Sequence, residues 1–266
     1  MTDFKFCEEA ISSQSQDFEK VALTPKYNVR NTFKDIFGVY LLQNLSFDGK
    51  YDMPCIGNFD DLSQIDYIAL YSDLQDYNKT SNTCICFYQY DHVFDGVKGL
   101  YNSIIYQDEA SLNKYKDRFK NVKYIIAPDY SLFGDFPNAV QIFNIYRSRL
   151  CACWLSANTK AKIIPNVRWT HPFTYEYCFD GIPEGSNIAI GFLGQIQDKE
   201  NRDIFIQGFK AAINKIKPKS IIVYGFATEN NFSRYFSYAK SKGIKLVFPH
   251  SKIDRYKKGD AIYGTR

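Results

Sequence analysis

The chain has 266 residues, 45% of them hydrophobic, which is enough to bury a sizeable core and excludes wholesale disorder. The formal net charge of +4, from 33 basic and 29 acidic residues, permits an anionic partner without requiring one. No apolar run is long enough to span a bilayer, and residues 1–20 are polar and acidic, unlike a signal peptide. We therefore expect a cytoplasmic protein with no membrane partner.

The seven cysteines agree with a reducing compartment. Four of them form Cys-x-Cys pairs, Cys84 with Cys86 and Cys151 with Cys153. Neither pair has the Cys-x-x-Cys spacing of zinc or redox sites. Cys84 and Cys86 would share one face of a strand, so we interpret them as small buried residues.

The first part of the chain, residues 1–60, is predicted to be irregular. Residues 1–30 are polar, and residues 31–42 suit a short helix or a strand equally. Gly49, Pro54 and Gly57 interrupt the next stretch, which we expect to be mostly loop.

An α/β core is predicted from residue 61 to residue 250. Strands are expected at 65–71 and 84–90, the second ending in Asp91 and His92. Gly96 and Gly99 break the pattern after that, and residues 111–120 are expected to form a helix or an irregular excursion.

The middle of the chain has the pattern of a βαβ unit. The apolar run 122–127 stops at Pro128 and Asp129, and the run 161–167 ends at Arg168 and Trp169. Between them, apolar residues recur at three- and four-residue steps through residue 157, which predicts a crossover helix.

Strands and helices continue to alternate in the second half. Strands are predicted at 187–194, 220–225 and 244–249, and helices at 199–216 and 230–242. Pro218 stops the first helix and Gly243 ends the second. The basic tail, residues 251–266, is expected to be loosely ordered.

This order of elements predicts an α/β fold with a mostly parallel sheet and crossover helices. About seven strands suit an irregular (β/α)-barrel-like form, and the alternative is an open doubly wound sheet. No linker divides the chain, so we predict a single domain over residues 1–266.

Several short blocks resemble a bacterial and phage family. They occur in the same order over roughly residues 84–250 and lie at residues 124–132, 141–149, 164–169, 178–183 and 221–225. The family they resemble is the "domain of unknown function" family 4417. The resemblance implies a phage or mobile-element origin, and it brings no established activity.

The strand ends supply the candidate catalytic residues, because parallel strands present their carboxyl ends at one edge. Asp129 is the first candidate, as a general acid or base, and its alternative role is an Asx-turn or helix cap. Asp91 and His92 are the further catalytic candidates. Ser131 lacks the Gly-x-Ser-x-Gly elbow of a nucleophile, so we place it with Tyr130 among the substrate-binding candidates.

The other substrate-binding candidates are anion contacts, aromatic walls and turn residues. Arg147 or Arg149 could clamp a phosphate or carboxylate, although two residues apart on a helix do not share a face, and only Arg147 is retained. Arg168 is a second anion contact, and Trp169 either stacks on a ligand or caps the core. The remaining candidates, all at turns or strand ends, are Asp180, Gly194, Tyr224 and Glu229.

The sequence predicts no metal site and identifies no cofactor. His92, His171 and His250 have no short metal-ligand spacing, and a folded site that combines Asp91, His92, Asp129 and His171 has no support from spacing. Gly191 to Gly194 could cradle a phosphate but matches no dinucleotide or Walker pattern.

Two functions remain open. The first is a hydrolase with a pocket at the carboxyl ends of the strands and a small-molecule substrate. The second is a non-enzymatic phage or mobile-element protein that binds nucleic acid, or a host or phage protein, in replication or counter-defence. Basic residues gather at Lys215, Lys217 and Lys219 and again between Lys252 and Lys258, where we expect a solvated face.

Overall fold

The computed structural model describes residues 39–42, 45–56, 62–193, 195–196, 198–225, 227–256, 261–262 and 264–265. Its helices are α2 (Asp91–Phe94), α3 (Leu100–Ile105), α4 (Glu109–Phe119), α5 (Asn138–Asn158), α6 (Lys199–Ile216) and α7 (Glu229–Ser241). Short 3-10 helices lie at Val39–Leu41, Leu74–Asp76, Pro172–Glu176 and Lys252–Tyr256. The predictions for residues 1–38 lie outside the described residues.

Parallel strands form two sheets. The first has the order β11 (His250–Ser251), β3 (Tyr67–Leu70), β4 (Thr83–Cys86), β5 (Tyr124–Ile126) and β6 (Lys162–Ile164). The second has the order β13 (Gly264–Thr265), β10 (Lys245–Phe248), β8 (Ser220–Tyr224) and β7 (Ile188–Gly191), with β13 alone antiparallel. The predicted α/β class with a mostly parallel sheet is confirmed.

The two sheets face each other in a barrel-like form without closing into a continuous barrel. A single parallel bridge, Asn166 to Ala189, joins β6 to β7. On the other side the chain passes through Pro249 from β10, which pairs with β8, into β11, which pairs with β3. Two short antiparallel pairs lie outside these sheets: the hairpin of β1 (Phe47–Asp48) with β2 (Met53–Pro54), and the long-range pair of β9 (Ala227–Thr228) with β12 (Ala261–Ile262).

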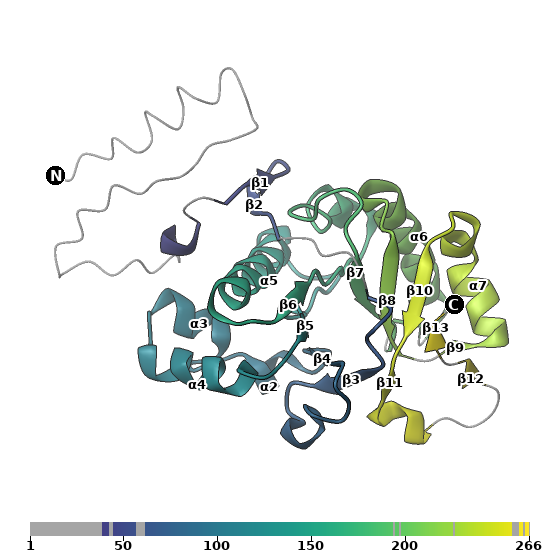
Figure 1. Ribbon diagram of the computed structural model, residues 1–266. Helices are drawn as coiled ribbons and strands as arrows, with labels where there is room; N and C mark the ends of the chain where they lie inside the picture. Colours follow the sequence, from purple (N-terminus) through teal and green to yellow (C-terminus); the bar gives the residue numbers. More distant parts are fainter. Residues whose placement is uncertain are drawn as a thin grey trace.

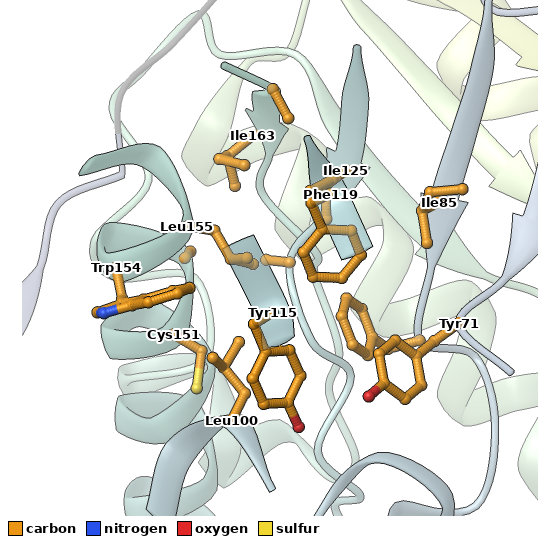
Figure 2. Packing of buried hydrophobic residues seen from close by; sticks show 14 of the residues in the cluster. Tyr71, Ile85, Leu100, Tyr115, Phe119, Ile125, Cys151, Trp154, Leu155 and Ile163 are labelled. Carbon is orange, nitrogen blue, oxygen red and sulfur yellow. The ribbon is translucent and has the colours of Figure 1, made fainter. Parts of the chain in front are cut away.

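Side-chain alternation along each strand divides the core into an inner and two outer layers. The inner layer takes residues from both sheets, among them Ile68, Cys84, Ile126, Ile164, Ala189, Ile222 and Val247. The outer face of β3–β6 packs on α3, α4 and α5, and that of β7, β8 and β10 packs on α6 and α7 (Figure 1). In the first outer layer, Trp154 and Leu155 of α5 pack toward Ile125 and Ile163 (Figure 2). Helices that cover only the outer face of each sheet are typical of a barrel, whereas a doubly wound sheet has helices on both faces.

The helix ends follow from local chemistry. The Asp198 side chain accepts a hydrogen bond of 2.8 Å from the Asn201 N–H and caps the amino end of α6. Helix α6 then ends at Lys217, which adopts a left-handed conformation with φ of 48°, and Pro218 prevents continuation. The predicted bounds of α6, 199–216, are confirmed.

Three segments differ from the sequence predictions. Residues 91–105 contain the short helices α2 and α3, which the sequence did not predict, and the expected break at Gly96 and Gly99 lies between them. Residues 47–54 form the β1–β2 hairpin and are not all loop. The tail contributes β11, β12 and β13, and β13 covers the edge of β10. The prediction of one domain over the whole chain stays a prediction.

Candidate functional site

The carboxyl ends of β5, β6, β7 and β8 bring polar side chains together around Asp129. This residue follows β5 and is 6% exposed. Its Oδ1 accepts a hydrogen bond of 2.7 Å from Asn166 Nδ2, and its Oδ2 lies 2.6 Å from Arg168 Nη1. Asn166 and Arg168 both follow β6, the next strand in the sheet. They are two residues apart in an extended segment, so both side chains point to the same side and reach the same carboxylate.

Burial controls the electrostatics of this carboxylate. Desolvation raises the pKa of Asp129, and Arg168 and Asn166 oppose that shift without reversing its direction. A carboxyl group with a raised pKa is suited to general acid–base chemistry, because its pKa moves toward neutral pH. Structural ion pairs also shift the pKa of their carboxyl groups, so the role of Asp129 depends on the geometry around it as well as on its pKa.

Two tyrosines extend the network away from Asp129. Tyr88, which follows β4, donates a hydrogen bond of 2.9 Å from its hydroxyl to Asn166 Oδ1. Its ring stacks on Tyr224 at the end of β8, with ring centroids 5.0 Å apart. Gly191 at the end of β7 lies against the Tyr88 ring, where any side chain would be in tight contact. Side chains at the carboxyl ends of β4, β5, β6 and β8 thus form one connected group, and Gly191 of β7 packs against it.

Beside Asp129 lies a small opening, here called the rim recess. It is lined by Asp129, Val167, Arg168, Trp169, Gly191, Gln195 and Phe205. Its cavity volume of about 10 Å³ is at the lower limit for a single water molecule. Any larger ligand would therefore lie over the recess and reach Asp129 and Arg168 from outside.

Comparison with known proteins now places the chain. The family model described as "Domain of unknown function (DUF4417)" matches residues 45–242. The chain belongs to this family. The confirmed family covers the blocks on which the resemblance was based, and it extends further toward the amino terminus than residue 84.

Curated relatives of the DUF4417 chain are phage proteins. It is 38% identical over 117 residues to the Gene 1 protein of Mycobacterium phage L5. This matched segment covers 44% of this chain and 50% of the relative. It is 34% identical over 117 residues to the Gene 1 protein of Mycobacterium phage D29, and this matched segment covers 44% of this chain and 43% of the relative. The match thus spans about half the length of these relatives, and no solved structure matches the chain.

Within the DUF4417 domain, Asp91 and Ser131 are hydrogen-bonded to each other and do not line the rim recess, but the charge of Asp91 helps to raise the pKa of Asp129. The Asp91 carboxylate accepts hydrogen bonds from the Ser131 N–H, at 3.1 Å, and from the Ser131 hydroxyl, at 2.8 Å. His92 is exposed, with its ring stacked on Tyr90 at 5.8 Å. These contacts hold the loop after β5 against α2.

Arg147 and Tyr130 form a separate group. Arg147 Nη1 lies 2.5 Å from Asp95 Oδ2, and its guanidinium lies 4.0 Å from the centre of the Tyr130 ring. Tyr130 is 2% exposed and its hydroxyl contacts the Cys151 thiol. Neither residue contributes to the lining of the rim recess.

Arg149, which was not among the substrate-binding candidates from the sequence, is fully buried and supports the backbone of the site. It donates hydrogen bonds to the carbonyl oxygens of Asp180 at 3.0 Å, Cys178 at 3.1 Å and Asn166 at 3.2 Å. Burial lowers the pKa of its guanidinium to about 10, so it stays charged at neutral pH. It therefore fixes the backbone of Asn166, the residue that holds Asp129.

The remaining candidates lie elsewhere or outside the described residues. The Asp180 side chain is buried beside Gly49, with Lys215 Nζ 3.7 Å from its Oδ1. Trp169 is 5% exposed and packs on Phe205 of α6, so only its edge reaches the recess. Gly194 and the side chain of Glu229 lie outside the described residues.

Metal binding receives no support from the part of the chain that the structure describes. No group of three or more His, Cys, Asp or Glu side chains there could hold a metal ion. None of the helices formed by those residues is long and apolar enough to cross a membrane.

Sequence reasoning missed Tyr88 and Asn166. Both lie two residues beyond the observed ends of β4 and β6, at the same edge as Asp129, but inside the longer strands predicted at 84–90 and 161–167. The rule that selected Asp129 therefore passed over them. Tyr88 lies 78 residues from its partner Asn166, and only the sheet order brings the two together.

Proposed function

We propose that the domain is a hydrolase whose reaction centre is Asp129 at the carboxyl end of the barrel-like sheet. The observation that carries this proposal is a buried carboxyl group with a raised pKa beside an opening that admits a water-sized group and no more. Such an opening suits a nucleophilic water better than a bound substrate atom. The substrate would lie across the opening.

Each residue has a defined role in this proposal. Asp129, in its ionised form, takes a proton from the water as the water oxygen bonds to the electrophilic atom of a substrate ester. The bond from that atom to the leaving oxygen then breaks, and the leaving oxygen takes the proton back from Asp129. Arg168, whose side chain is 23% exposed, contacts an anionic oxygen of the substrate or of the developing intermediate. Its Nε is buried and has no hydrogen-bond partner among the described residues, so the contact falls to the exposed part of the guanidinium. Asn166 and Tyr88 orient Asp129.

Hydrolysis of chromogenic esters tests this proposal. The probes are p-nitrophenyl acetate, p-nitrophenyl phosphate and bis(p-nitrophenyl) phosphate, with the wild type, Asp129→Asn and Asp135→Asn compared. Asp135 is an exposed carboxylate in the loop before α5 and serves as the matched control. We expect Asp129→Asn to lose on the order of 100-fold in kcat and the control to lose nothing.

The pH profile provides a second readout. Because the base acts only when ionised, kcat/KM should rise as pH rises through the raised pKa of Asp129. A wild type that hydrolyses none of the three probes, or an Asp129→Asn variant as active as the wild type, contradicts the proposal.

The cellular location is part of the same proposal. Cys55, Cys84, Cys86, Cys151, Cys153 and Cys178 are all unbonded, which supports a reducing compartment such as the cytoplasm.

A further inference from the structure

A dense group of lysines lies at the opposite end of the strands from Asp129. The turn that leads from α6 into β8, residues 214–219, and the turn that leads from α7 into β10, residues 240–245, together contain six lysines and no acidic residue. All six side chains are exposed. We call this surface the lysine face, and it consists of Lys215, Lys217, Lys219, Lys240, Lys242 and Lys245.

Sheet register holds the two turns side by side. Strands β8 and β10 are parallel neighbours, with Lys245 opposite Ser220. The Lys245 N–H donates a hydrogen bond of 3.2 Å to the Lys219 carbonyl oxygen. Like charges on directly neighbouring strands repel each other, so this arrangement costs stability unless an anion is present.

The lysine face surrounds a cavity of about 270 Å³, lined by Ile213, Asn214, Lys217, Pro218, Lys242 and Ile244. The volume is close to the lower end of small-ligand pockets. Its floor is apolar, since Ile213 is 3% exposed and Pro218 is buried, and two lysines and an amide stand at its edge. The hydroxyl of Tyr238 donates a hydrogen bond of 2.6 Å to Asn214 Oδ1 and fixes that amide between α6 and α7.

The conformation of Lys217 adds an independent observation. With φ of 48° it occupies the left-handed position at the end of α6, where glycine is the usual residue because other side chains are strained there. A cation is favourable near a helix carboxyl end, which offsets part of the strain. Its ion pair with Glu184 joins two side chains that are each 63% exposed, so the pair contributes little and can exchange for a phosphate.

In the other predicted basic cluster, Lys252 is the basic residue whose side chain is described. Lys252 Nζ lies 3.1 Å from Asp73 and 3.4 Å from Asp76, so nearby carboxylates neutralise its charge. In the lysine face Lys215 and Lys217 also have acidic partners, Asp180 and Glu184. The two turns nevertheless contain six lysines and no acidic residue, and they border a cavity with an apolar floor.

We propose that the lysine face binds single-stranded nucleic acid, with backbone phosphates on the lysines and one base in the cavity. A flat base has apolar faces for the floor and polar edges for the Asn214 amide. The base must be unpaired to enter, which selects a single strand over a duplex. This binding activity is independent of the hydrolytic centre, because the two sites lie at opposite ends of the strands.

Fluorescence anisotropy with a labelled oligodeoxythymidylate of about 20 nucleotides tests the proposal. The full chain is compared with a variant that carries Lys217→Gln, Lys242→Gln and Lys245→Gln. If these lysines each contact one phosphate, the slope of log K against log salt concentration should fall by about 2, since each contact contributes about 0.7. We expect affinity at about 50 mM salt to fall at least tenfold.

The matched control removes the same charge elsewhere, with Lys98→Gln, Lys114→Gln and Lys199→Gln, all at exposed positions. Urea unfolding shows whether both variants retain the fold. The proposal is overturned if the wild type does not bind the oligonucleotide at low salt, or if both variants lose affinity equally. Tighter binding of a duplex of mixed sequence than of its separate strands overturns the placement of a base in the cavity.

Discussion

Arg168 Nη1 lies 2.6 Å from Asp129 Oδ2, and still the pKa of the Asp129 carboxyl group is raised. The cost of burying the carboxylate, together with repulsion from Asp91, therefore exceeds the stabilisation from its ion pair and from its hydrogen bond with Asn166. This relationship makes Asp129 a poor stabilising residue at neutral pH. It also provides a measurable signature that does not depend on knowing a substrate.

The first prediction concerns stability against pH. A carboxyl group with a raised folded-state pKa contributes stability that is fully present below its ordinary pKa of 3.8 and is lost as pH rises through the raised value. Relative to Asp129→Asn, which cannot ionise, the wild type should lose free energy of unfolding as pH rises above 3.8 toward neutral. Urea unfolding of both proteins at several pH values measures this difference. A wild type that gains stability over the variant as pH rises would mean that Arg168 outweighs burial.

The second prediction concerns the hydroxyl of Tyr88. Tyr88→Phe leaves the ring stack with Tyr224 in place and removes only the donor to Asn166 Oδ1. The loss should be about 1 kcal/mol in the free energy of unfolding. Tyr224→Phe is the matched control, because it changes the other ring of the same stack. Equal losses in the two variants would show that the Tyr88–Asn166 hydrogen bond has no special weight.

The third prediction concerns Arg149. Arg149→Met leaves three buried carbonyl oxygens, those of Asp180, Cys178 and Asn166, without their donor. Each such group costs about 1–3 kcal/mol, so the variant should lose at least about 3 kcal/mol or fail to fold. Arg149→Lys should also be destabilised, because one ammonium cannot reproduce the guanidinium fork. A loss below about 1 kcal/mol in urea unfolding of Arg149→Met would contradict the structural role.

The fourth prediction concerns Gly208 in α6. A Cβ built on Gly208 overlaps the indole of Trp169, whose Nε1 donates a hydrogen bond of 3.3 Å to the Ile204 carbonyl oxygen. Alanine normally stabilises a helix interior by about 1 kcal/mol over glycine. Here Gly208→Ala should instead destabilise by about 1–3 kcal/mol, because the indole must shift. Intrinsic fluorescence and urea unfolding measure both effects, with Gln207→Ala on the exposed side of α6 as the control.

Elements with local signals could be predicted from the sequence. Helix α6 has an apolar stripe, an aspartate cap and a terminating proline, all within Asp198 to Pro218, and its bounds were predicted correctly. The strand ends at Asp129 and Arg168 were also identified, because each follows a short apolar run. Information of this kind does not depend on where the rest of the chain lies.

Relationships between distant segments could not be predicted. Asn166 and Asp129 lie 37 residues apart, and Tyr88 and Asn166 lie 78 residues apart, so their contact depends on strand order and register. The same holds for Arg147 and Arg149, whose surroundings are set by how α5 packs. Helices α2 and α3 were missed for a different reason, since they are only 4 and 6 residues long, too short to show a helical repeat, and the expected break at Gly96 and Gly99 lies between them.

The passage of the chain through Pro249 has a consequence for how the molecule assembles. Strand β11 pairs with β3, so the last parallel segment of the chain lies beside the first. Such a contact between remote segments carries a loop-closure cost that slows its formation, and we expect it to form late in folding. Until it forms, β3 presents an unpaired strand edge, which is the kind of edge that promotes association between partly folded chains. Loss of the residues after Pro249 would therefore affect solubility during refolding before it affected the rim recess.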